Sequence, residues 1–201
     1  MSSLLSIFDF IPAWVTFLPI AVCSVILLAV VIERIIFFRI AERTLSSDLD
    51  RFFSALSSGG REKALGVAVQ SGSIIVTSLS VFFQIPAGHD PVVYFQFVAE
   101  KAQRRIERYI SVVSTIATIA PMFGLLGTIT GMMKSFGALS KGGAASQELL
   151  ASGIAEALLT TAFGLIVAIP ALIFHNYLIS KSSALVKELE INANRLMQNE
   201  Q

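Results

Sequence analysis

Three long stretches of this 201-residue chain contain no Asp, Glu, Lys or Arg. They cover Phe10–Ile32, Tyr109–Met133 and Ala157–Ser180, and each has at least 23 residues. About 20 predominantly apolar residues in a helix cross the roughly 30 Å hydrocarbon layer of a membrane, so each stretch is long enough to span it. All 15 Lys and Arg and all 14 Asp and Glu lie elsewhere. The sequence therefore predicts a membrane protein with a soluble part.

A fourth uncharged run, Ala64–His89, has a different character. It contains several Ser, Thr and Gln residues, and its bulky side chains Ile75, Leu79 and Phe82 recur at helical spacing. This pattern is typical of an amphipathic helix that packs on another element. As a span it would also place the basic cluster in 101–108 on the wrong side of the membrane. We therefore expect three spans.

The distribution of Lys and Arg predicts the orientation, because cytoplasmic flanks of spans collect basic residues. None precedes the first span, whereas basic residues follow it, precede the second span and follow the third. Since the start lacks the basic region of a cleavable signal peptide, the first span is expected to remain as an anchor. The predicted segments are a periplasmic N-terminus (1–12), a first span (13–33), a cytoplasmic helical loop (34–108), a second span (109–136), a periplasmic loop (137–151), a third span (152–179) and a cytoplasmic C-terminal helix (180–201).

The local signals predict helices throughout. Gly59–Gly60 indicates a helix break, and Asp90 followed by Pro91 is a favourable helix start. Between Asp90 and Lys134 the only strong breaker is Pro121, so a single helix is expected to run from the cytoplasm through the second span. The predicted fold class is an all-α membrane protein with three transmembrane helices, the second and third extended into the cytoplasm as long helices.

Several classes of function are poorly supported. A formal net charge of +1 without a long basic run gives no electrostatic basis for a nucleic-acid partner. The single cysteine, Cys23, lies in an apolar run, and the two histidines, His89 and His175, are far apart. No zinc motif or catalytic triad is recognisable, so we expect no metal, no cofactor and no enzymatic activity.

The third span begins with one acid, Glu156, set against an apolar stretch. A charge at bilayer depth costs a few kcal/mol, so it should face a cavity or a partner. Alternatively, Glu156 is a hydrated acid in the first turn of a helix, where the helix dipole favours it. Thr160 lies one turn further on with Thr161 beside it, and Gly153 and Gly164 belong to a stripe of small residues suited to close helix contact. These neighbours favour a proton pathway or pore.

The second span has the same kind of stripe. Gly124 and Thr128, and Gly127 and Gly131, form two pairs of small residues four positions apart, which permit close approach of another helix. Thr128 also belongs to a stripe of hydroxyls along this span. Hydroxyls in spanning helices often only bond the carbonyl four residues back, and Thr128 differs from the others only by its small neighbours. We assign the three glycines to helix packing.

Two prolines interrupt these spans, Pro121 in the second and Pro170 in the third. Each frees a backbone carbonyl and permits a kink. Because proline is common in spanning helices, a role in packing is the default interpretation.

Residues 120–133 (APMFGLLGTITGMM) and 153–170 (GIAEALLTTAFGLIVAIP) resemble the paired motifs of the ExbB/TolQ family of proton-channel motor subunits, which is distantly related to the flagellar stator subunit MotA. The resemblance is specific in these two blocks and extends to three spans with the N-terminus outside, where MotA-like stators have four spans. The predicted cytoplasmic loop and C-terminal helix are similar to those of the family only in their general character, not in specific motifs. Ser152 stands where the family usually has a proline, and His175 where a tyrosine is common.

The resemblance implies a homo-oligomer in the bacterial inner membrane, a pentamer that surrounds the single-span helices of an ExbD/TolR-like partner among membrane lipids. A TonB/TolA-like protein that spans the periplasm is a further implied partner. Proton flow would drive outer-membrane transport or envelope processes. By position, the family's acid matches Glu156 and its pore threonines match Thr128 and Thr161. The essential aspartate of this family belongs to the partner, so this chain alone is not expected to conduct protons.

Two other functions remain open. In a static membrane scaffold, the glycines would only hold helices together and Glu156 would be an interfacial acid. An intramembrane enzyme would need a nucleophile and a base that face each other across spans, and the sequence offers no convincing pair.

Overall fold

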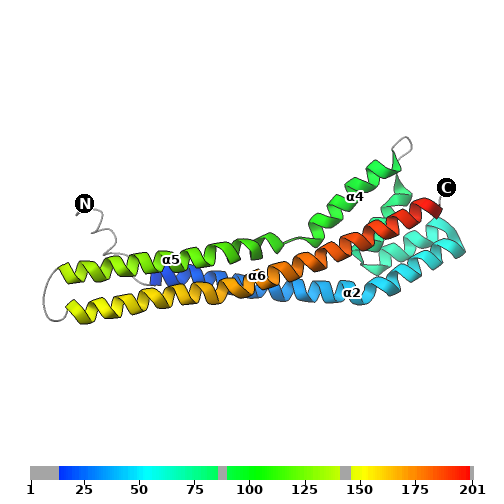
Figure 1. The fold of residues 1–201 in the computed structure, drawn as a ribbon. Helices are drawn as coiled ribbons and strands as arrows, with labels where there is room; N and C mark the ends of the chain where they lie inside the picture. The colour runs from blue at the N-terminus through cyan, green and yellow to red at the C-terminus, as the bar shows by residue number, and fades with distance from the viewer. Residues whose placement is uncertain (1–13, 86–89, 141–145, 200–201) are drawn as a thin grey trace. The chain divides into compact units, whose positions relative to one another are not determined.

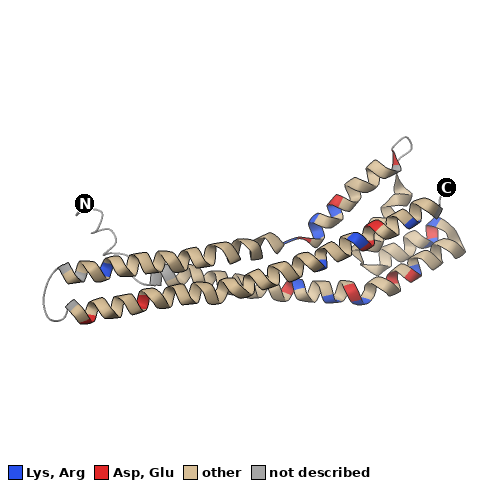
Figure 2. Ribbon diagram, viewed as in Figure 1, with Lys and Arg blue, Asp and Glu red and all other residues tan. Residues whose placement is uncertain are grey.

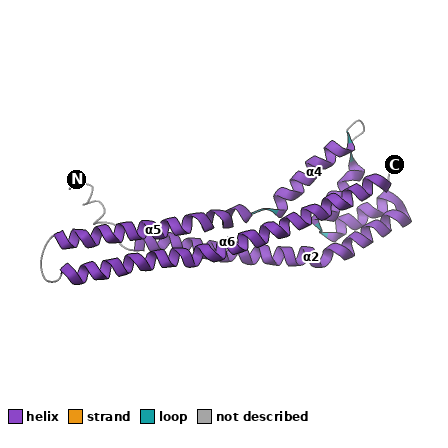
Figure 3. Ribbon diagram, in the orientation of Figure 1, coloured by secondary structure: helices purple, strands orange, loops and turns teal. Residues whose placement is uncertain are grey.

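The computed structural model describes residues 14–85, 90–140 and 146–199, and every regular element in these ranges is helical (Figures 1 and 3). The elements are α2 (Trp14–Ser71), α3 (Ile74–Ser80), the short 3-10 helix η1 (Val81–Gln84), α4 (Pro91–Ile106), α5 (Ile110–Ser140) and α6 (Ser146–Asn199). The prediction of an all-α fold is confirmed. The predicted N-terminal segment 1–12 and residues 141–145 of the predicted periplasmic loop lie outside the described residues.

Three helices, α2, α5 and α6, contain segments that are long and apolar enough to cross a membrane. Long parts of α5 and α6 carry very few charged residues (Figure 2). The run Ala64–His89 is not a fourth span, because α2 ends at Ser71 and Gly72 adopts a φ of 61° before α3 begins. Ile75 and Leu79 in α3 are buried, as the amphipathic pattern predicts. The expectation of three spans is confirmed.

The chain divides into two compact units, which are described separately. The first unit comprises residues 1–31 and 111–176, and it contains the apolar segments of α2, α5 and α6. Its described core is made of small and branched side chains at intervals of three or four residues, as expected for helices that bury one stripe. The ring of Phe17 on α2 contacts that of Phe163 on α6 edge to face, with 5.8 Å between centroids.

The second unit comprises residues 32–110 and 177–201. On α6 its buried positions include a series whose spacings alternate between four and three in the manner of a coiled-coil seam: Leu178, Ser182, Leu185, Leu189, Asn192 and Leu196. Phe52 of α2 is fully buried in the same unit. This part of α6 is therefore amphipathic, whereas its preceding part is apolar almost all round.

Two local predictions are confirmed in the second unit. Gly60 interrupts α2 with non-helical angles (φ 70°, ψ −167°), and glycine adopts a positive φ without a steric penalty. At the start of α4, the Oδ1 atom of Asp90 accepts a hydrogen bond of 2.8 Å from the backbone N–H of Val92. Pro91 occupies the first turn, where its missing N–H is not needed.

The prediction of one unbroken helix from Asp90 to Lys134 is wrong. The chain leaves the helical path between α4 and α5, where Tyr109 has a left-handed φ of 67°. The buried Arg34 of α2 donates a hydrogen bond of 3.2 Å to the carbonyl of Ile106, at the end of α4. Its guanidinium also lies 5.7 Å from the centre of the Tyr109 ring, and that of Arg108 lies 4.5 Å from it. These contacts offset the roughly 1–2 kcal/mol cost of a left-handed tyrosine.

Candidate functional site

The helices α5 and α6 approach each other closely within the first unit, along a line of glycines. The glycines in this contact are Gly124, Gly127 and Gly131 of α5 and Gly153 and Gly164 of α6. A Cβ atom added to Gly127 would lie 2.3 Å from Cγ2 of Thr160, and one added to Gly164 would lie 2.7 Å from the carbonyl oxygen of Ala120. Any larger residue at either position would push the two helices apart.

The other end of the contact is equally tight. A Cβ atom on Gly131 would lie 2.7 Å from that of Ala157, and one on Gly153 would lie 2.0 Å from Oγ of Ser135. The partner of each glycine therefore belongs to the same chain. The small-residue stripes serve the contact between α5 and α6 of one subunit.

The three candidate threonines occupy different environments. Thr160 is only 2% exposed and packs against Gly127, while Thr128 and Thr161 are half-buried. The hydroxyl of Thr161 crosses to α5 and donates a hydrogen bond of 3.0 Å to the carbonyl of Gly124. This bond fixes the register of the two helices toward the end of the glycine line that contains Gly164.

The other two hydroxyls bond within their own helices. Thr160 donates to the carbonyl of Glu156 at 3.0 Å, and Thr128 donates to that of Leu125 at 2.7 Å. Each hydroxyl oxygen keeps its lone pairs, so it can still accept a hydrogen bond. Of the two, the half-buried Thr128 is the one that an outside group can reach.

Glu156 lies on an exposed face of α6, one turn before the buried Thr160. Among the residues that the structure describes, its carboxylate has no hydrogen-bond or ion-pair partner. The same helix exposes Leu159, Phe163 and Ile166. A carboxylate set among exposed apolar side chains is costly to bury in lipid unless it faces a partner or a water-filled cavity.

Two buried polar residues of the site were not predicted from the sequence. Thr130 is 6% exposed and Ser135 is 3% exposed, and Oγ of Ser135 lies against Gly153 of α6. Their hydroxyls donate to carbonyls of α5, and the acceptor for Ser135 is Gly131. A usable signal was their position three or four residues beyond Gly127 and Gly131, which places them on the same helix face.

The remaining predicted features lie where expected in the chain. Pro121 is inside α5 and Pro170 is inside α6, and both helices continue through them. His175 is half-buried, and its Nδ1 atom has no partner among the described residues. Within the same ranges no group of three His, Cys, Asp or Glu is arranged to hold a metal ion.

The fold and the site together describe a three-span helical membrane protein with an exposed acid on its third spanning helix. Residues 92–191 match the MotA/TolQ/ExbB proton channel family, and this chain belongs to that family. It is 30% identical to ExbB-like 3 of Synechocystis over 167 residues, which cover 79% of this chain and 77% of the relative.

Other relatives match shorter regions. The identity is 44% to ExbB-like 1 of Synechocystis over 88 residues, or 42% of this chain and 35% of that protein. It is 40% to the Tol-Pal system protein TolQ of Haemophilus influenzae over 83 residues, or 41% of this chain and 36% of that protein. The alignments thus span about a third of these two relatives, and the resemblance noted in the sequence is confirmed at the level of the family.

Proposed function

We propose that this chain is the channel subunit of a motor in the bacterial inner membrane that is driven by the proton motive force. Glu156 carries this proposal, because it is an exposed acid of a spanning helix and has no partner among the described residues of its own subunit. Thr128 and Thr161 are half-buried on the two helices that pack together beside it. A proton path needs a titratable group and hydroxyls that order water or relay protons.

The same reasoning requires other chains in the complex. This chain has a single intramembrane carboxylate, so the second acid of a relay must come from a partner, which we propose to be an ExbD/TolR-like single-span protein. α5 and α6 expose rows of large apolar side chains such as Leu125, Ile129, Leu159 and Ile166. These rows suit contacts with lipids and with further copies of the chain, and we propose a pentamer around the partner. The work driven would be outer-membrane transport or an envelope process, with a TonB/TolA-like protein as the element that spans the periplasm.

Substitution of the acid tests the proposal. Glu156→Gln keeps the shape of the side chain but cannot ionise, so motor-dependent uptake or growth should be lost while the complex still assembles. Glu156→Asp keeps the charge on a chain about one methylene shorter, so it should retain part of the activity. Glu148→Gln is the matched control, because Glu148 is an acid in the first turn of the same helix. Full activity of Glu156→Gln would remove the acid from the proton path.

A static scaffold is the second candidate, and one observation favours it. The hydroxyls of Thr128, Thr160 and Thr161 all donate to backbone carbonyls, as structural threonines in spanning helices do. Thr128→Val and Thr161→Val separate the two functions, because they preserve volume and delete the hydroxyl. A proton path predicts reduced activity with an intact complex. A scaffold predicts that activity follows the amount of assembled complex.

The proposed orientation places the N-terminus in the periplasm and the C-terminus in the cytoplasm. In a Cys23→Ser background, cysteines at Ser3 and Ser146 should react with a membrane-impermeant thiol reagent in intact cells. A cysteine at Ser58 should react only after permeabilisation. Labelling of position 58 from outside would contradict the orientation.

A further inference from the structure

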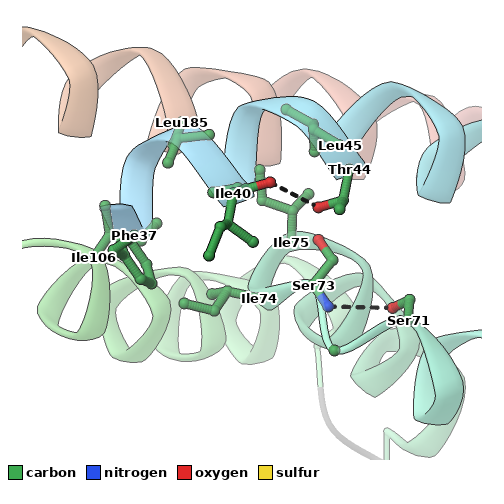
Figure 4. Close-up of a pocket in the computed structure, with 12 residues that line it drawn as sticks. Phe37, Ile40, Thr44, Leu45, Ser71, Ser73, Ile74, Ile75, Ile106 and Leu185 are labelled. Carbon is green, nitrogen blue, oxygen red and sulfur yellow. Dashed lines mark hydrogen bonds between the residues drawn. The ribbon is translucent and has the colours of Figure 1, made fainter. Parts of the chain in front are cut away.

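The second unit contains an apolar pocket of about 370 Å³. Its walls come from α2, from the Ser71–Ser73 connection, from α3, from the end of α4 and from α6. Figure 4 shows Phe37, Ile75, Ile106 and Leu185 around the space. Ile75, Ile106 and Leu185 are at most 5% exposed, so the pocket reaches the core of this unit.

Two of the three hydroxyls in the wall, those of Thr44 and Ser71, are already bonded to the protein. The hydroxyl of Thr44 donates to the carbonyl of Ile40, and that of Ser71 accepts from the N–H of Ser73 (Figure 4). The Ser71 hydroxyl also donates to the carbonyl of Ala68. A polar ligand would therefore gain little in place of its bonds to water. The wall selects an apolar occupant.

The volume indicates the size of the occupant. An apolar protein cavity of about 150 Å³ holds one benzene molecule, which has six carbon atoms. A pocket of about 370 Å³ is roughly two and a half times as large and so holds about 15 carbon atoms. This is the size of one acyl chain.

A row of exposed isoleucines leads from the first span to the mouth of the pocket. Ile32, Ile36 and Ile40 are 56%, 53% and 58% exposed, and their spacing of four places them on one face of α2. Ile32 ends the first uncharged stretch of the sequence, while Ile40 also lines the pocket. An acyl chain can follow these apolar side chains from the bilayer to the pocket.

Basic side chains flank the row. Arg39 and Arg43 follow Ile36 and Ile40 by three residues, so they are neighbours of the row on the surface of the helix. Both are exposed, and neither guanidinium has a hydrogen-bond or ion-pair partner in the described part of the chain. A guanidinium binds phosphate oxygens with two parallel hydrogen bonds. The surface beside the mouth can therefore hold a phosphate headgroup.

We propose that this pocket binds one acyl chain of an anionic membrane phospholipid, whose phosphate lies against Arg39 and Arg43. The Ile32–Ile36–Ile40 row is the route by which the chain leaves the bilayer. The lipid would fix α2, α3, α4 and α6 of this unit around a common apolar ligand. The proposal requires a membrane protein but does not require proton conduction.

Photo-labelling tests the proposal on the full chain in vesicles of phosphatidylethanolamine and phosphatidylglycerol. A trace of phosphatidylglycerol with a diazirine near the end of one acyl chain is irradiated, and labelled peptides are identified by mass spectrometry. We expect label on residues of the pocket wall such as Ile75 or Leu185, in addition to label on the spans. A parallel sample receives the diazirine fatty acid in place of the phospholipid.

Variants assign the label to the pocket. Ala41→Phe places a ring in the pocket and excludes about six carbon atoms of the ligand, so the pocket label should fall at least about tenfold while the span label is unchanged. Ala184→Phe is the matched control at an exposed position of the same unit. Arg43→Gln should lower the pocket label about fivefold. Ile36→Ser changes an exposed side chain and should also lower it without a risk to folding.

Three results would overturn the proposal. The first is label on the spans of the wild-type chain with none on the pocket wall. The second is pocket label that Ala41→Phe and Ile36→Ser leave unchanged. The third is pocket label from the free fatty acid but not from the phospholipid.

Discussion

The tightest contact between α5 and α6 predicts the effect of one added methyl group. In Gly127→Ala the new Cβ would lie 2.3 Å from Cγ2 of Thr160, which is 1.1 Å short of the 3.4 Å at which ordinary contact begins. Thr160 is 2% exposed, so it cannot turn away into solvent. Overpacking of this kind costs about 1–3 kcal/mol, and the better helix propensity of alanine returns at most about 1 kcal/mol. We expect a net loss of about 1–2 kcal/mol.

Thermal unfolding of the purified complex in one detergent measures this loss. For a chain of this length it corresponds to a fall of about 2–8 °C in the midpoint. Thr160→Ser removes the nearest methyl group, so the double variant should be more stable than the sum of the two single changes by about 1 kcal/mol. Gly66→Ala is the control, because an added Cβ there has no atom within 4 Å and should not destabilise the protein. A Gly127→Ala protein as stable as Gly66→Ala, with no coupling to Thr160→Ser, would refute the contact.

Two further predictions concern the second unit. Arg34→Met should lower the free energy of unfolding by about 2–4 kcal/mol, because the carbonyl of Ile106 loses its donor. Arg34→Lys should lower it less, because lysine keeps a charge and a donor. Denaturant titration measures both, and an Arg34→Met variant of wild-type stability would count against this role. Lys181 donates a hydrogen bond of 2.6 Å to Glu42, which raises the pKa of the ammonium group. The ion pair that raises this pKa stabilises the fold fully at any pH below the pKa of a free lysine. This stabilisation is lost only as the pH rises through the raised pKa. Lys181→Gln should therefore have the same small effect on stability at about pH 6.5 and about pH 8.5, and an effect that changed between these values would contradict the assignment.

The sequence predicts the fold well where the cause of a structure is local. The three uncharged stretches, the break at Gly60 and the helix start at Asp90 all depend on residues that lie next to one another in the chain. The break before α5 has no such cause, since tyrosine is not a helix breaker. Tyr109 is held in place partly by Arg34, which lies far away in the sequence. Only a tertiary contact could have revealed this break.

The same distinction holds at the site. The spacing of Gly124, Gly127 and Gly131 predicts a close helix contact, but it does not say which helix makes it. Thr160 and Thr161 differ by one position, and the structure gives them opposite roles in packing. One is buried against Gly127, and the other reaches across to a carbonyl. The rotation of α6 about its own axis decides which of the two threonines faces Gly127. This rotation depends on how α5 and α6 pack against each other.

The line of glycines also determines how the first unit can move. A rotation of α5 or α6 by one residue about its own axis would drive a side chain into the backbone of the other helix, and the hydrogen bond from Thr161 to Gly124 would break. The two helices are therefore held as one rigid body. Any change of conformation in this unit must therefore move α5 and α6 together. The contacts that change are those of the exposed outer faces of this helix pair, where Glu156 and the large apolar side chains lie.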